Sequence, residues 1–199
     1  MFTGIVEKKA QILEWSPSRP GRSISLKVAG GWDKLALGSS VSVDGCCLTV
    51  SRRGRGRIVF DLLNETLRRT RFSSLRPGDW VNLERPLKSG QRIEGHFVLG
   101  HIDGTGKILK ALSGKKEKSL LISFPQVVKN YILSKGSVAV NGVSLTIGKI
   151  EKGAFWVHGI PHTLKWTNLD QLAPGDRVNL EADALLKFWH SQKIFGSIK

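Results

Sequence analysis

An internal repeat limits what this chain can fold into more than any other feature of its sequence. VDGCCLTV at residues 43–50 returns as VNGVSLTI at 140–147, and LRPGDWVNLE at 75–84 returns as LAPGDRVNLE at 172–181. Both pairs lie at one offset, which also aligns Gly4-Ile5 with His101-Ile102. Each copy is too long for a solenoid unit. The sequence therefore predicts a tandem duplication of a small domain, in residues 1 to about 86 and about 97 to 183, joined by the linker RPLKSGQRIEG.

Both copies carry the local signals of β-hairpins. Asp44-Gly45 and Asn141-Gly142 each separate two runs of alternating apolar and polar residues. Such dipeptides favour a type I′ turn, because both central residues need positive φ. Frequent glycine turns and little helical periodicity indicate two small antiparallel barrels in series. Only short helical segments are expected, namely one turn each in NETLRR and PHTLKW and a short helix in FPQVVKNYILSKG.

The alternation around the two hairpin turns sorts their residues into an apolar and a polar face. Cys47 and Thr49 share the polar face in the first copy, and Ser144 and Thr146 share it in the second. A solvated strand surface is the simpler interpretation of either pair alone, because threonine is common in strands. The same kind of pair occurs in both copies, which favours a pocket. Cysteine and serine are similar in size, so either one can occupy the same position in such a pocket.

The charge balance leaves several partners open. Lys and Arg total 31 against 16 Asp and Glu, a net charge of +15. Such an excess fits nucleic acid, an anionic small substrate or a generally basic proteome. The basic runs at 52–57, 67–71 and 114–118 fall at expected turns and loops, and the tryptophans do not interleave with them. We therefore expect solvated surface and no nucleic-acid partner.

The cysteines, the histidines and the start of the chain argue for a reducing compartment. Cys46 and Cys47 are neighbours and a poor pair for a disulfide, so we expect a cytoplasmic protein. The first residues lack the apolar run of a signal peptide, and no stretch is long enough to cross a membrane. His96 and His101 lie close in sequence, but the usual zinc spacings are missing, so no metal is expected.

Six segments in order carry a family resemblance: MFTGIV, GCCLTV, GHFVLGHIDGTG, KGSVAVNGVSLT, IPHTLKWTNL and PGDRVNLEAD. Together they resemble the riboflavin synthase family over residues 1 to about 185. The resemblance implies an all-β fold of two tandem six-stranded antiparallel Greek-key barrels, at 1–96 and 97–185, with a short C-terminal helix or tail at 186–199. It implies a transferase that dismutates two molecules of 6,7-dimethyl-8-ribityllumazine, the last step of riboflavin biosynthesis. One molecule gives a four-carbon unit to the other, yielding riboflavin and 5-amino-6-(D-ribitylamino)uracil, without cofactor or metal.

The resemblance also implies an assembly. The family forms a homotrimer whose active site lies between the N-terminal barrel of one subunit and the C-terminal barrel of its neighbour, and lumazine synthase is a possible further partner. Leu185, Leu186, Trp189 and Lys193 have helical spacing in the tail, and Gly196 is expected to end the helix. This helix either forms the trimer contact or packs on its own barrel.

Site residues follow from the resemblance position by position. Catalytic groups are implied at Cys47, His101, Ser144, Thr146 and Asp183. The first pocket also receives Gly4, Ile5, Val6, Leu48, Thr49, Asp61, Leu62, Asn64, Glu65 and Thr66. The second also receives Gly100, Ile102, Leu145, His158, Gly159, Ile160, Pro161, His162 and Thr163. Ser40, Asn82 and His96 match further family positions, and Lys135 is expected to reach in from a neighbouring subunit.

The implied reaction does not need a strong base. The 7-methyl group of the lumazine is acidic because its anion delocalises into the ring, so His101, or a water held by Ser144 and Thr146, is expected to accept the proton. Cys47 and Ser144 either add to the ring or orient a water that does. Two similar pockets suit a reaction that uses one compound twice. Cys47 against Ser144, and His101 against Gly4, would make the pockets unequal.

Two alternatives remain open at this point. The first is a lumazine or flavin carrier without catalytic activity, which would share the duplication. The presence of Cys47, His101, Ser144 and Thr146 favours the enzyme over this carrier. The second is a basic barrel that binds single-stranded RNA on aromatic side chains. A gel shift that is sensitive to salt would favour this second alternative.

Overall fold

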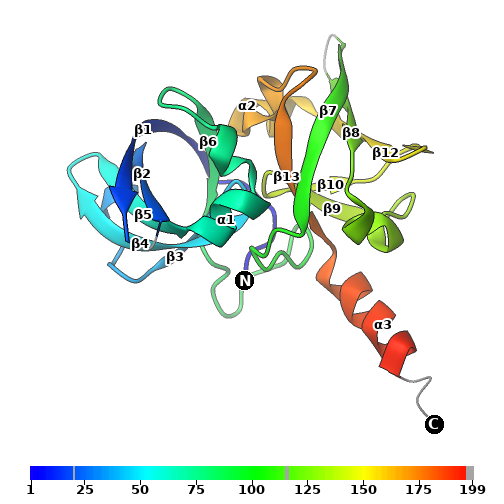
Figure 1. The fold of residues 1–199 in the computed structure, drawn as a ribbon, viewed down its shortest axis with the longest axis horizontal. Coiled ribbons are helices and arrows are strands. Elements are labelled where there is room, and N and C mark those ends of the chain that lie inside the picture. Colours follow the sequence, from blue (N-terminus) through cyan, green and yellow to red (C-terminus); the bar gives the residue numbers. More distant parts are fainter. Residues whose placement is uncertain (20, 115–116, 196–199) are drawn as a thin grey trace.

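The computed structural model describes residues 1–19, 21–114 and 117–195 as two β-barrel units side by side, with one helix extending away from both (Figure 1). The first barrel consists of β1 (Lys8–Ser18), β2 (Gly21–Lys27), β3 (Ser40–Val43), β4 (Cys46–Gly54), β5 (Arg57–Leu63) and β6 (Trp80–Glu84). It is closed in the order β1-β2-β5-β4-β3-β6. Because β3, β4 and β5 form consecutive hairpins and β6 returns beside β3, the topology is the expected Greek key.

The second sheet has seven strands where six were expected. They are β7 (Gly104–Ser113), β8 (Lys118–Ser123), β9 (Ser137–Val140), β10 (Val143–Thr146), β11 (Ile150–Glu151), β12 (Ala154–Gly159) and β13 (Arg177–Ala182). The extra strand arises because β10 and β11 together take the place of β4. Across the interruption the amide of Gly148 donates to Trp156 O at 2.8 Å, and the amide of Trp156 donates to Lys149 O at 2.9 Å. These bonds join β12 to the segment after β10, so the ring of strands continues.

The short helical segments confirm the local sequence signals. The helices α1 (Asn64–Arg69) and α2 (Pro161–Trp166) are single short turns at matching places in the two copies, and Gln126–Tyr131 is a 3₁₀ helix. The helix α3 (Ala184–Phe195) ends the described chain, so the expected stop at Gly196 and the side chain of Lys193 lie outside the described residues. Among the described residues no helix combines the length and apolar character needed to span a bilayer.

The hairpin turns meet at the seam between the barrels. Asp44 and Asn141 have φ values of 45° and 47°, as the type I′ interpretation requires. The side-chain amide of Asn82 donates to Asn141 O at 2.9 Å, and that of Asn179 donates to Asp44 O at 2.9 Å. Each barrel thus holds the hairpin turn of the other through an asparagine at the same place in its last strand.

Strand pairing corrects the alignment of the first part of each copy. Ser23 lies opposite Asp61 in the first barrel, and Ser119 lies opposite His158 in the second. The second copy therefore has one more residue between β8 and β9 than the first has between β2 and β3. Before that point the offset is one residue shorter, so Gly4 corresponds to Gly100. The expected match of Gly4 with His101 is wrong, and Ile5 is the counterpart of His101.

Candidate active site

The N-terminal arm (residues 2–6) and the central arm (residues 98–102) cross between the barrels. They meet where Phe2 and Val98 exchange backbone hydrogen bonds of 2.7 and 3.1 Å, with both side chains fully buried. Beyond this crossing each arm lies against the barrel of the other copy. The amide of Ser144 donates to Gly4 O at 2.8 Å, and the amide of Cys47 donates to Gly100 O at 2.9 Å.

This crossing corrects how the expected residues group into pockets. The sequence placed Gly4 with Cys47 and Gly100 with Ser144, and the hydrogen bonds show the reverse. The arms continue the same way, because Ile102 packs on the core of the first barrel and Val6 on that of the second. The first site therefore combines Cys47 with the central arm, and the second combines Ser144 with the N-terminal arm.

Two buried glutamates fix the arms. Glu84 accepts hydrogen bonds from the amides of Thr3 at 2.6 Å and Gly4 at 3.1 Å. Glu181, at the same place in the second copy, accepts from the amides of Leu99 at 2.7 Å and Gly100 at 3.0 Å. Burial raises the pKa of Glu84, and burial raises the pKa of Glu181 to about 7. Neither glutamate was expected to act at the site, although both follow Val-Asn-Leu at the end of an apolar strand, a pattern that occurs in each copy.

The second site contains a serine–histidine pair. His96 Nδ1 lies 2.7 Å from Ser144 Oγ, and its buried Nε2 has no hydrogen-bond partner within the described part of the chain. Burial lowers the pKa of His96, and the carboxylate of Asp183 opposes this shift. A neutral imidazole beside a hydroxyl can accept its proton. Three expected site residues are thus brought together, and His96 comes from the segment directly after the linker between the two copies.

The second barrel also carries a pocket of about 500 Å³ in front of Ser144, lined by Lys135, Thr146, His158, Ile160 and Thr163 among others. His158 Nδ1 lies 2.8 Å from Ser119 Oγ, which fixes the imidazole at the pocket wall. Lys135 has a φ of 68°, at the place where the first copy has Gly38 with a φ of 82°. Lys135 thus lines this pocket of its own chain, and its expected reach into a neighbouring subunit stays a prediction.

The first site has the same backbone arrangement as the second but different functional groups. Cys47 is half-buried and Thr49 exposed, as the alternation predicts, and Ser40 pairs with Thr49 across β3 and β4. The counterpart of His158 is Asp61, whose Oδ1 accepts hydrogen bonds from Ser23 at 2.5 Å and Ser18 at 3.1 Å. The hydrogen bond from Ser23 is the largest cause of a lowered pKa of Asp61.

Cys46, the residue before Cys47, is a poor nucleophile. Burial raises the pKa of Cys46 to about 12, because the charged thiolate is disfavoured in the core. Its side chain belongs to the apolar face of β4, as the sequence predicts. Cys47 is therefore the thiol that can take part in chemistry at this site.

Several expected substrate-binding residues are buried or bonded within the protein. Asn82 is 1% exposed and belongs to the seam, where its amide also donates to Asn168 Oδ1 at 3.0 Å. Leu48 and Leu62 are buried in the first core, and Leu145 is largely buried but still borders the second pocket. Glu65 forms an exposed ion pair with Arg69. The remaining expected residues lie around α1 and α2, where Asn64 and Thr66 are in α1, Pro161, His162 and Thr163 are in α2, and Gly159 ends β12.

Comparison with known proteins agrees with this duplicated arrangement. The family model described as Lumazine binding domain matches residues 3–86 and 99–183. Riboflavin synthase of Escherichia coli (strain K12) is 39% identical over 186 residues, which cover 92% of this chain and 87% of the relative. Riboflavin synthase of Bacillus subtilis (strain 168) is 34% identical over 195 residues, which cover 96% of this chain and 88% of the relative.

Solved structures show the same fold. LumP complexed with riboflavin has a TM-score of 0.86 and 26% sequence identity, covering 92% of this chain and 99% of that one. LumP complexed with 6,7-dimethyl-8-(1'-D-ribityl) lumazine has a TM-score of 0.83 at the same identity and the same coverage.

Proposed function

The chain belongs to the lumazine-binding family and acts as a riboflavin synthase, and we propose that Cys47 and Ser144 stand at the centres of its two substrate sites. The single observation that carries this assignment is the crossed pair of arms. Gly100 meets Cys47 and Gly4 meets Ser144 through equivalent backbone bonds. Two sites of one design suit a reaction in which the same lumazine is both donor and acceptor of the four-carbon unit.

The base in this proposal is the pair of His96 and Ser144. The 7-methyl group of the lumazine loses a proton to form a delocalised anion. Ser144 Oγ lies 2.7 Å from His96 Nδ1, so a proton that reaches the hydroxyl can pass to a neutral imidazole. This assignment replaces the expected role of His101 as base. His101 follows Gly100 on the central arm, and its side chain is exposed.

The two sites differ in their functional groups, which suits a reaction in which one lumazine is the donor and the other the acceptor. The first site offers a thiol at Cys47 and an ionised carboxylate at Asp61. The second offers a hydroxyl at Ser144 with His96 behind it, and an imidazole at His158. We propose that the hydroxyls and charged groups around each site hold the ribityl chain. Much of the rate acceleration then comes from holding the ring systems of the two lumazines in a fixed relative orientation.

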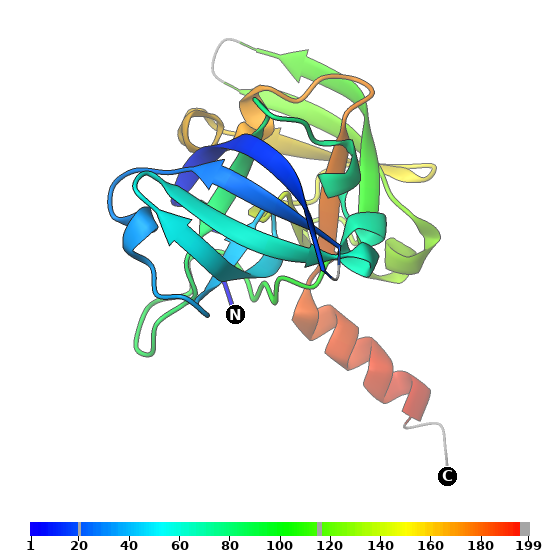
Figure 2. The same ribbon diagram turned by 60° about the vertical axis from the view of Figure 1, so that its left-hand side comes forward.

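We further propose that the chain works as a homotrimer, with α3 as an assembly element. Figure 2 shows α3 extending away from both barrels. Its Leu185 and Phe188 side chains are 60% and 64% exposed, which is unusual for large apolar residues on a single helix of an isolated protein. A cytoplasmic location is consistent with the unpaired thiols of Cys46 and Cys47. Contact with lumazine synthase and the domain limits of 1–96 and 97–185 stay predictions.

Turnover of the lumazine tests the assignment against the carrier. Incubation of the protein with 6,7-dimethyl-8-ribityllumazine should produce the absorbance of riboflavin, and Ser144→Ala should slow this by about a hundredfold through loss of the proton path. A carrier would bind the lumazine and leave its spectrum unchanged over hours. Sedimentation of the wild type and of Phe188→Glu tests the assembly, because a charge at this position should shift a trimer toward monomer.

A further inference from the structure

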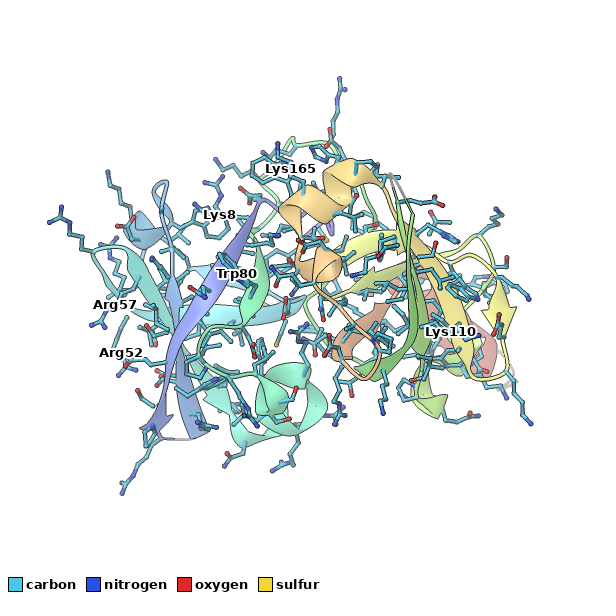
Figure 3. All side chains as sticks on the ribbon, turned by 90° about the horizontal axis from the view of Figure 1, so that it is seen from above. Lys8, Arg52, Arg57, Trp80, Lys110 and Lys165 are labelled. Carbon is cyan, nitrogen blue, oxygen red and sulfur yellow. The ribbon has the colours of Figure 1, made fainter. Side chains whose placement is uncertain are left out.

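The outer wall of the first barrel carries a basic groove, and its lining includes none of the residues assigned to the two substrate sites, although Ser23 and Arg52 contact Asp61 of the first site. This outer groove has a volume of about 320 Å³ and is lined by Ser23, Ser25, Arg52, Arg53, Arg57 and Val59, among others. Figure 3 shows Arg52 and Arg57 next to each other at the edge of the first barrel, far from Lys110 on the second. The lining also includes Glu14, whose carboxylate lies 3.8 Å from Arg57 Nη1.

The floor of the outer groove is formed by two serines of β2. Ser23 and Ser25 are 2% and 3% exposed and alternate with the core residues Ile24 and Leu26. Ser25 Oγ is buried and has no hydrogen-bond partner among the residues that the structure describes. Buried hydroxyls are nearly always hydrogen-bonded, so this one is a donor suited to a ligand.

The second copy of the repeat is an internal comparison. The pair Ser25 and Val59 corresponds by register to Leu121 and Trp156. The indole of Trp156 donates to Glu151 Oε1 at 2.9 Å, and Lys149 Nζ lies 3.6 Å from the same oxygen. In the second barrel a large side chain thus occupies this place, and Glu151 neutralises the nearby cation.

The first copy lacks both of these features. Val59 is small where Trp156 is large, and Gly54 stands at the position of Glu151. Arg57 stands at the position of Ala154, so the first copy has a guanidinium group where the second copy has a methyl side chain. Arg52 Nη2 donates to Ser23 Oγ at 2.8 Å and lies 3.4 Å from Asp61, while Arg53 donates to backbone carbonyls. The groove therefore has more guanidinium groups than carboxylates to balance them.

We propose that the outer groove binds the phosphate group of a small anion, either inorganic phosphate or a phosphate monoester. Guanidinium groups and a serine hydroxyl are donors that match phosphate oxygens. The volume suits a phosphate with a small organic group. The six named lining residues include no aromatic side chain on which a nucleobase could stack. A single-stranded nucleic acid is therefore the less favoured occupant.

Titration with inorganic phosphate and with ribose 5-phosphate tests the proposal, with the ionic strength held constant by chloride. ³¹P NMR should show saturable binding of at least one of the two, and whichever binds identifies the source of the phosphate group. Arg57→Ala should weaken this binding about tenfold, as expected for loss of a charge-assisted hydrogen bond. Val59→Trp, which copies the second barrel, should abolish it.

Lys110→Ala is the matched control, because Lys110 corresponds by register to Glu14 of the groove, and this variant should bind phosphate like the wild type. All three variants should keep their rate of riboflavin formation, because none of these residues lines the pocket in front of Ser144 or belongs to the catalytic pair, and this rate also confirms folding. If Val59→Trp misfolds, Arg57→Ala alone decides. Absence of saturable binding, equal affinity in Arg57→Ala, or displacement of phosphate by a far lower concentration of single-stranded oligonucleotide would each overturn the proposal.

Discussion

Gly100 lies against Cys47 so closely that no other residue fits there without movement. The amide of Cys47 donates to Gly100 O at 2.9 Å, and a Cβ built on Gly100 would lie 2.5 Å from Cys47 Cβ. Gly100 also has a φ of 84°, a left-handed conformation that favours glycine. The contact joins different copies of the repeat, so the position of the thiol depends on an arm from the second copy.

Gly100→Ala should therefore impair the first site. The added Cβ must displace the central arm or Cys47, and the rate of riboflavin formation should fall by about tenfold or more, because small misplacements are costly in catalysis. Alkylation of Cys47 by a thiol reagent should become faster as the arm moves away. Gly175→Ala is the matched control. Its φ is 101°, but a Cβ there would meet nothing within 4 Å, so only backbone strain of about 1 kcal/mol is expected. Equal turnover in the two variants would contradict the role of the contact.

The pair of His96 and Ser144 predicts a pH profile. Burial lowers the pKa of His96 below its ordinary value of 6.5, so the imidazole stays neutral and able to accept a proton until the pH falls well below that value. The acid limb of kcat/KM should have its midpoint below 6.5, and His96→Gln should lose about a hundredfold in rate together with that limb.

The control for this prediction is His190→Gln. His190 packs edge-on against Tyr131 with a centroid distance of 5.6 Å and has no place in either site. It should keep both the rate and the acid limb of the wild type. An acid limb that persists unchanged in His96→Gln would assign the base to another group.

Glu181 predicts a dependence of stability on pH. Burial raises its pKa from 4.5 to about 7, so between these values the folded protein holds a proton that the unfolded chain has released. The free energy of unfolding should then fall as the pH rises from 4.5 to 7, by on the order of 3 kcal/mol. Denaturant unfolding at pH 5 and pH 8 measures this slope, and Glu181→Gln should reduce it.

The same variant should loosen one arm only. Glutamine offers one carbonyl oxygen where Glu181 offers two oxygens to Leu99 and Gly100, so one amide loses its partner. Alkylation of Cys47 should become faster in Glu181→Gln. It should stay near the wild-type rate in Glu84→Gln, because Glu84 holds the arm that meets Ser144. Equal alkylation in both variants would mean that the glutamates do not control the arms separately.

Much of the fold could be predicted because its signals are local and occur twice. The turns at Asp44 and Asn141 fix the hairpins, and the alternation after them places Cys47 and Ser144 outward. The crossing of the arms had no such signal, since Phe2 and Val98 form an isolated bridge far apart in sequence. His96 was expected from the family resemblance and not from the repeat, because it lies between the matched segments 3–86 and 99–183. The extra residue before β9 was hidden by the chance match of Gly4-Ile5 with His101-Ile102.

Lys135 allows a role in binding to be separated from a role in stability. A residue other than glycine in the left-handed region costs about 1–3 kcal/mol, and Lys135 keeps a φ of 68° where the first copy has Gly38. Lys135→Gly removes this strain but raises the entropy of the unfolded chain by about 0.5–1 kcal/mol, so the free energy of unfolding should stay level or rise slightly.

Binding should respond in the opposite direction. Lys135 lines the pocket in front of Ser144, so its loss should raise the KM for the lumazine by about tenfold, through loss of a charged hydrogen bond. Steady-state kinetics and denaturant unfolding of the same preparation measure both effects. The control is Lys152→Gly, whose exposed side chain lies in the turn between β11 and β12 and should leave KM unchanged. A lower stability of Lys135→Gly with an unchanged KM would show that this lysine serves the fold and not the site.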